Sequence, residues 1–130
     1  MMKLIIAIDF DGTIAETDFP TIIALRPHAA AVINKLAADG HTIIVHSCRA
    51  NKPAQDMKAF LDTHGIRYHH INENSPDRIK IYGYDTRKIS ADIYIDDHNL
   101  GCNGIYWPEV YYQIQMEIAK LQHKKEEIII

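Results

Sequence analysis

The sequence predicts an α/β fold of three layers, in which a parallel β-sheet carries helices on both faces. Two observations favour this class. Short apolar runs rich in β-branched residues recur along the chain, as expected of strands that are buried on both faces. Longer segments with apolar residues at helical spacing separate these runs, which is typical of parallel strands joined by helical crossovers.

The elements are expected in a regular order along the chain. Strands are expected at 4–8, 41–46, 66–71 and 91–95, and helices at 27–39, 52–64 and 109–124. Pro27 suits the first turn of its helix, and Gly40 suits the end of the same helix. Residues 72–88 show no firm period and are expected to form a loop, with a short extended piece at 79–82 as an open alternative.

Length and composition predict one domain in a soluble protein. The 130 residues leave little room for a second module, and 47% hydrophobic with 24% charged residues is ordinary for a globular chain. The net charge of −3 argues against broad nucleic-acid binding. The apolar run 4–8 is too short for a membrane span or a signal peptide, and Cys48 and Cys102 form no disulfide framework. We therefore expect a cytoplasmic protein without membrane contact.

Polar residues directly follow the predicted strands, and ligands of parallel sheets bind at that edge. After the first strand, Asp9 and Asp11 point the same way in extended backbone, and Gly12 allows a sharp turn. One cation could sit between the two carboxylates. A plain turn that ends the strand is the competing interpretation.

The second strand ends in Ser47, Cys48 and Arg49. A serine hydroxyl beside the free N–H groups of a helix start forms a natural phosphate site, although Ser47 as a turn residue or helix cap is the simpler alternative. Arg49 is a candidate substrate contact at the same edge. Cys48 as a nucleophile is disfavoured, because no activating partner is evident nearby.

The fourth strand ends in Asp96 and Asp97, a second acidic pair. Aspartates that converge on one spot need a cation, and an all-oxygen set of ligands favours Mg²⁺. Lys88, just before that strand, could neutralise a phosphate oxygen, with Lys80 as the competing lysine. The eight histidines lack the spacing of a known metal motif and are expected to be solvated or structural, but His98 is a candidate substrate contact.

In order and character these segments resemble the four signature motifs of the haloacid dehalogenase-like (HAD) hydrolase superfamily. The segments are Asp9-Phe10-Asp11-Gly12-Thr13, Ser47, Lys88 and Asp96-Asp97. The resemblance implies a Rossmann-like HAD fold and a magnesium-dependent phosphatase. The usual glycine before the acidic pair of the fourth motif is missing here.

The resemblance also implies a role for each residue. Asp9 is then the nucleophile that forms an aspartyl-phosphate, and Asp11 the general acid and base. Ser47 and Lys88 hold the phosphoryl group. Asp9, the backbone carbonyl of Asp11 and Asp96 bind Mg²⁺, with Asp97 as a ligand, directly or through water, or as an orienting neighbour.

The intervals between the motifs are too short for a separate cap domain, so a single capless domain over 1–130 is expected. An open site suits a bulky phosphate unless a neighbouring subunit closes it. We expect a small phosphate ester such as a sugar phosphate or nucleotide, and a homo-oligomer through the apolar residues 128–130 stays open. The alternatives are a signalling module that resembles a receiver domain, and an inactive binding domain of the same fold.

Overall fold

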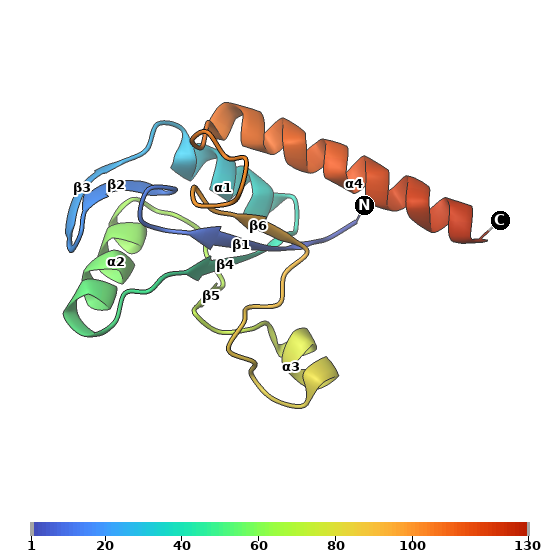
Figure 1. Cartoon of the computed structure of the whole chain (residues 1–130), viewed down its shortest axis with the longest axis horizontal. Coiled ribbons are helices and arrows are strands. Elements are labelled where there is room, and N and C mark those ends of the chain that lie inside the picture. The colour runs from blue at the N-terminus through green and yellow to red at the C-terminus, as the bar shows by residue number, and fades with distance from the viewer. Residues whose placement is uncertain (1, 130) are drawn as a thin grey trace.

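The structure is a computed structural model that describes residues 2–129, with side chains described as far as Lys125. Its elements are, in chain order, β1 (Ile5–Asp9), β2 (Ala15–Asp18), β3 (Thr21–Leu25), α1 (Ala29–Ala38), β4 (Thr42–His46), α2 (Asn51–Thr63), β5 (His70–Ile71), α3 (Pro76–Tyr82), β6 (Ile93–Ile95) and α4 (Trp107–Ile129). Figure 1 shows their arrangement.

A central sheet has the strand order β5-β4-β1-β6, and all of its neighbouring strands run parallel. The α/β class and the parallel sheet expected from the sequence are therefore confirmed. β1 lies between β4 and β6, and its last residue, Asp9, is in register with His46 of β4. The carboxyl ends of β1, β4 and β6 consequently meet at one edge of the sheet.

The main core lies on one face of this sheet. Ile6, Ile8 and Phe10 point into it from β1 and the following loop, because side chains alternate along a strand. The remaining fully buried residues of this core include those contributed by α1, α2 and α4, namely Ile33, Leu36, Met57, Leu61 and Trp107. These three helices thus cover the same face.

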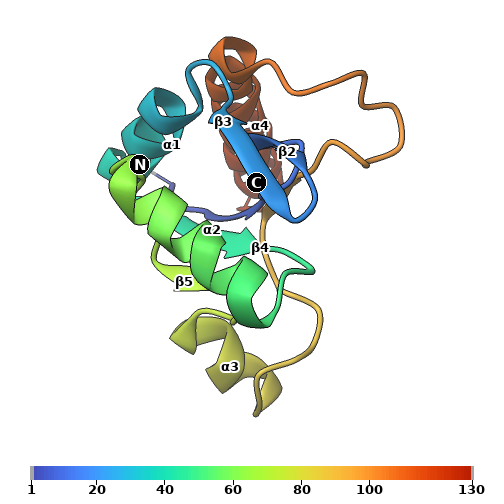
Figure 2. The same cartoon turned by 90° about the vertical axis from the view of Figure 1, so that its left-hand side faces the viewer.

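The opposite face has a thinner cover. Ala7 and Ile44 of the sheet are buried there against Ile89, with α3 beyond them. None of the residues of α3 is buried. Figures 1 and 2 show α3 set apart from the other helices, below the sheet. The expectation of helices on both faces holds, but one face carries three helices and the other a single short one.

Two segments differ from the sequence-based expectation. Residues 76–82 form the helix α3, where a loop was expected and a short extended piece at 79–82 was an open alternative. The Ser75 side chain caps this helix and Pro76 occupies its first turn. These two residues favour the start of a helix here, although the apolar residues show no clear helical spacing. The third strand, expected over 66–71, shrinks to the two residues of β5, because His69 and His70 leave a mostly polar strand at the edge of the sheet.

The segment between β1 and α1 forms an antiparallel hairpin, β2–β3, that the sequence did not predict. In Figure 2 this hairpin stands in front of the carboxyl edge of the sheet. At the other end of the chain, α4 packs Val110, Ile114 and Ile118 on the core. Within the described range, no helix combines the length and the apolar character that crossing a bilayer requires.

Candidate active site

The loop after β1 turns sharply at Gly12. The φ angle of Gly12 is +81°, in the left-handed region that favours glycine. The N–H groups of Thr13 and Ile14 donate to the carbonyl oxygen of Phe10 at 3.2 and 2.9 Å. A Cβ atom on Gly12 would lie 2.3 Å from Oδ2 of Asp97. Glycine therefore allows the loop to pack directly against the acidic pair that follows β6.

Thr13 connects the two acidic segments. Its buried hydroxyl lies 3.1 Å from Oδ2 of Asp9 and 3.3 Å from Oδ1 of Asp97. The same oxygen accepts a hydrogen bond of 3.1 Å from the Asp97 backbone N–H. Nε1 of Trp107, at the start of α4, donates to the carbonyl oxygen of Thr13 at 2.8 Å. These contacts fix Asp9 and Asp97 next to each other.

Crowding of negative charge changes the protonation of Asp9. Burial raises its pKa most, and the charge of Asp96 and the neighbouring carboxylate of Asp97 raise it further. The hydrogen bond from Thr13 opposes the rise only in part, so the pKa of Asp9 reaches about 7 from an ordinary 3.8. A cation between these carboxylates would remove the repulsion that raises this pKa.

The donor set fits Mg²⁺. Asp96, Asp97 and His98 each offer one ligand atom, and these atoms lie within 4.8 Å of one another. With Asp9 beside Asp97, the site is rich in carboxylate oxygens, which hard divalent cations prefer. The three aspartates would hold the ion. His98 is exposed, and its Nε2 lies 3.8 Å from Oδ2 of Asp97.

Ser47 follows β4 and is held by Asn72, which follows β5. The Asn72 side chain accepts a hydrogen bond of 2.8 Å from the Ser47 N–H and donates one of 3.0 Å to the Ser47 carbonyl oxygen. Oγ of Ser47 accepts from the backbone N–H of Arg49 at 3.0 Å. Hydrogen bonds thus hold both the backbone and the hydroxyl oxygen of Ser47, which suits a group that must meet a ligand in one geometry.

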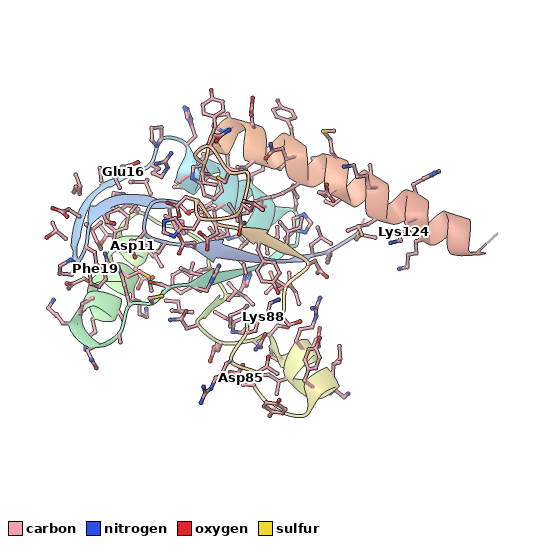
Figure 3. All side chains as sticks on the ribbon, viewed as in Figure 1. Asp11, Glu16, Phe19, Asp85, Lys88 and Lys124 are labelled. Carbon is pink, nitrogen blue, oxygen red and sulfur yellow. The ribbon has the colours of Figure 1, made fainter. Side chains whose placement is uncertain are left out.

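Lys88 lies in the irregular segment between α3 and β6, as Figure 3 shows. The buried amide of Asn74 holds this segment, because it donates to the carbonyl oxygen of Thr86 at 3.0 Å and accepts from the N–H of Ser90 at 2.6 Å. Nζ of Lys88 lies 5.5 Å from the centre of the Tyr94 ring. The ammonium group of Lys88 consequently lies beside Tyr94 of β6.

Asp11 forms an ion pair with Arg49. Nε of Arg49 donates to Oδ2 of Asp11 at 2.9 Å, and Nη2 donates to Oδ1 at 2.7 Å. Burial alone would raise the pKa of Asp11. The hydrogen bonds from Arg49 and Thr17, with the Arg49 charge, outweigh burial and lower the pKa of Asp11 below its usual value. Asp11 is therefore an ionised carboxylate in this arrangement.

The hairpin β2–β3 participates in this ion pair. Nη1 of Arg49 donates to the carbonyl oxygen of Pro20 at 3.0 Å, and the guanidinium lies between the rings of Phe10 and Phe19, 5.3 and 5.0 Å from their centres. Figure 3 shows Phe19 on the hairpin and Asp11 between the hairpin and the sheet. Arg49 thus ties the hairpin tip to Asp11.

A pocket of about 520 Å³ opens at the carboxyl edge, on the thinly covered face of the sheet. Its lining joins residues from five parts of the chain: Asp9, His46, Ser47, Cys48, Asn72, Arg87, Lys88, Ile89, Tyr94 and Asp96. Acidic residues and candidate phosphate-binding residues therefore face one space. Its size suits a small ligand.

The structure brings most of the expected residues together. Asp9, Ser47, Lys88 and Asp96 line one pocket, and Asp97 touches the Asp9 loop. Of the two candidate lysines, Lys88 lines this pocket, and Lys80 belongs to the last turn of α3. Arg49 differs from the expectation of a substrate contact: its side chain is fully buried in the ion pair with Asp11.

Three residues of the site carried no predicted role. Thr13 stood within the first motif, but only the fold shows that its hydroxyl faces two carboxylates. Asn72 and Asn74 lie in a segment interpreted as loop, and their hydrogen bonds reach 25 and 16 residues along the chain. The only sequence signal was the presence of amides beside a strand end. Of the pair His69–His70, His69 has a structural role, because its Nδ1 accepts from the N–H of Ile43.

The fold and the site together define an α/β protein with an acidic, metal-compatible site at the carboxyl edge of a parallel sheet. A solved structure of a conserved protein from Bacteroides thetaiotaomicron is similar to this chain, with 31% sequence identity and a TM-score of 0.78. The match covers 89% of this chain and 93% of the other. The chain therefore belongs to the same family as that conserved protein. No protein-family model and no curated protein matches the sequence.

Proposed function

We propose that this protein is a Mg²⁺-dependent phosphohydrolase of the HAD-like type, which cleaves phosphate monoesters through an aspartyl-phosphate on Asp9. One observation carries the proposal: Asp9 faces the same pocket as Ser47, Lys88 and Asp96. A nucleophile, phosphate-binding donors and metal-binding carboxylates thus converge on one space, in the order along the chain that the four HAD motifs have.

Asp9 is the nucleophile in this proposal. One of its carboxylate oxygens attacks phosphorus, the bond from phosphorus to the ester oxygen breaks, and a covalent aspartyl-phosphate remains. Attack requires the ionised form of Asp9. A bound Mg²⁺ would supply the charge that lets an anionic carboxylate approach an anionic phosphate. Thr13 keeps the attacking carboxylate oriented through its hydrogen bond.

Asp11 transfers protons in both halves of the reaction. It gives a proton to the departing ester oxygen, and then takes a proton from the water that attacks phosphorus and releases Asp9. Its ion pair with Arg49 favours the carboxylate, which is the form that the second half requires. In the first half Asp11 must carry a proton, so the contact with Arg49 has to loosen.

Ser47 and Lys88 bind the phosphoryl oxygens. Asn72 fixes the Ser47 backbone, and the ammonium group of Lys88 provides a point charge over the Tyr94 ring. Donors fixed in advance stabilise the charge of the transition state without reorganisation. Phosphate binding therefore depends on the two amides, Asn72 and Asn74, that hold these side chains in place.

No separate cap covers the site in this proposal. The interval after β1 holds only the hairpin β2–β3, and the interval after β5 holds the seven residues of α3. Substrate selection then depends on the pocket and its surroundings on the sheet face. This supports a small phosphate ester as the substrate class.

A receiver-like signalling module is the alternative with the same sheet and acidic pocket. Such modules carry the phosphorylated aspartate after the third strand of the sheet. Here Asn72 follows that strand, and its amide is engaged with the Ser47 backbone. The arrangement favours the hydrolase.

Hydrolysis of 4-nitrophenyl phosphate with and without Mg²⁺ tests the proposal. The natural chain is expected to turn over only with the metal, and Asp9→Asn is expected to lose about 10³-fold or more of kcat, because the amide is a poor nucleophile. Asp18→Asn is the matched control, since Asp18 is exposed on β2 away from the pocket. Undiminished turnover in Asp9→Asn would rule out the nucleophile.

A further inference from the structure

A second pocket, of about 440 Å³, adjoins the pocket that contains Asp9. The two pockets share Lys88 and Tyr94. The second one continues over the thinly covered face of the sheet toward α3, where Tyr82 lines it. A ligand whose phosphate lies beside Lys88 can therefore extend its organic part into this second pocket.

Two aromatic rings line this second pocket. Tyr94 is rigid, because its hydroxyl donates to the carbonyl oxygen of Ile89 at 2.7 Å and accepts from the N–H of Ala91 at 3.1 Å. Tyr82, the last residue of α3, leaves 52% of its surface exposed. An exposed tyrosine at the wall of a pocket offers a flat surface on which a planar ring can stack.

The charges around the second pocket are largely compensated. Arg78 donates to Oγ of Ser90 at 2.7 Å and forms an ion pair of 2.8 Å with Asp92. The hydroxyl of Thr86 donates to the carbonyl oxygen of Lys88. Only the Lys88 ammonium, at the junction of the two pockets, lacks a carboxylate partner among the described lining residues of this pocket. The pocket consequently suits an uncharged group with a planar ring better than a second anion.

We propose, resting on the proposed phosphohydrolase function, that the second pocket binds the leaving group and that the substrate is a nucleoside monophosphate whose base stacks on Tyr82. The phosphoryl group lies between Asp9 and Lys88, and the nucleoside extends past Tyr94. A single nucleotide fits better than a nucleic-acid chain, because 17 acidic residues outnumber the 14 lysines and arginines.

Matched substrates and matched tyrosine variants test this assignment. The natural chain, with Mg²⁺, is expected to show at least tenfold higher kcat/KM for adenosine 5′-monophosphate than for ribose 5-phosphate, which lacks the base. Tyr82→Ala is expected to lose about 5- to 100-fold on the nucleotide, as for other base-stacking residues, and to stay within about twofold on the sugar phosphate. Tyr84→Ala is the control, because Tyr84 is also exposed but lines neither pocket.

Equal kcat/KM for the two substrates, or equal losses in the two tyrosine variants, would overturn the assignment. Calorimetric titration of both compounds into Asp9→Asn, with Mg²⁺, measures binding to the second pocket in a variant that is not expected to hydrolyse them. The subsite is supported if Asp9→Asn prefers the nucleotide and Asp9→Asn/Tyr82→Ala does not. This result supports the subsite even if the natural chain hydrolyses neither compound, and in that case only the proposed function fails. Tighter binding of a 5′-phosphorylated oligonucleotide than of the mononucleotide would contradict the monomeric substrate class.

Discussion

Arg49 and Asp11 form a two-pronged ion pair in which the guanidinium is wholly buried and the carboxylate keeps 29% of its surface exposed. The pair connects the segment after β4 with the loop after β1. Pairs of this planar geometry are stronger than a single contact to a lysine. Arg49 thereby orients Asp11, and neither residue of the pair is among those that line the pocket.

Arg49→Gln tests this orientation. Loss of the positive charge raises the pKa of Asp11, so the acid side of the pH–rate profile is expected to move to higher pH. Arg49→Lys keeps the charge and should recover part of the shift. Arg67→Gln, at an exposed arginine, is the control. A profile that keeps its position in Arg49→Gln would contradict the role of the ion pair.

Asp9 makes the stability of the metal-free protein depend on pH. Its pKa is about 7 in the folded chain and ordinarily 3.8, so between these values the folded chain holds a proton that the unfolded chain releases. The contribution to stability is complete below the lower value and is lost as pH rises through the upper one. Thermal unfolding without Mg²⁺ is therefore expected to show a lower Tm at about pH 8 than at about pH 5.

Asp9→Asn is expected to flatten this pH dependence, since the amide does not titrate. Mg²⁺ is expected to raise the Tm of the natural chain more at the higher pH, because the metal binds the ionised carboxylates of the folded state. If the Tm of Asp9→Asn fell with rising pH as much as the Tm of the natural chain, a group other than Asp9 would control stability in this pH range.

Gly12 permits the close approach of its loop to Asp97. Gly12→Ala is expected to weaken Mg²⁺ binding at least tenfold, because the new Cβ atom would lie 2.3 Å from Oδ2 of Asp97 and displace it. Gly101→Ala is a matched control, with a similar φ of +85° and open space around the position. The free energy of unfolding should fall by about 1–2 kcal/mol in both variants, because alanine is strained in the left-handed region. A titration with Mg²⁺ should then show weaker binding only in Gly12→Ala. Equal metal affinities would argue against Asp97 as a ligand.

Lys88 and Lys80 can be distinguished by their glutamine variants. Lys88→Gln is expected to lower kcat/KM for 4-nitrophenyl phosphate about 10²-fold, since it removes the charge that faces the phosphoryl group. Lys80→Gln is expected to stay within about twofold, because Lys80 lies on α3 outside the pocket. The reverse result would exchange the roles of the two lysines.

The sequence predicts those helices and strands whose apolar residues follow a clear pattern over many positions. β1 and β4 are continuous apolar runs, and α1, α2 and α4 repeat apolar residues over 10 or more residues. The helix α3 was not predicted, because seven residues are too few to show apolar residues at a helical spacing. The hairpin β2–β3 was not predicted either, since its exposed strands lack a clear alternation of buried and exposed residues.

In the candidate site, the functional residues could be predicted from the sequence but their contacts could not. Asp9, Ser47 and Asp96 were predictable because each stands at the carboxyl end of an apolar run, and parallel strands bring their ends to one edge. The partners of these residues were not predictable. The contact of Arg49 with Asp11 spans 38 residues, and the packing of Gly12 against Asp97 depends on the fold of the whole sheet.

Trp107 gives this protein an internal fluorescent reporter. It is the single tryptophan of the sequence, it is buried, and its indole N–H bonds to the backbone of Thr13. The hydroxyl of Thr13 in turn lies beside the carboxylates of Asp9 and Asp97. Binding of a metal or phosphate ligand at the acidic site is therefore expected to change the tryptophan emission, without a label and without turnover.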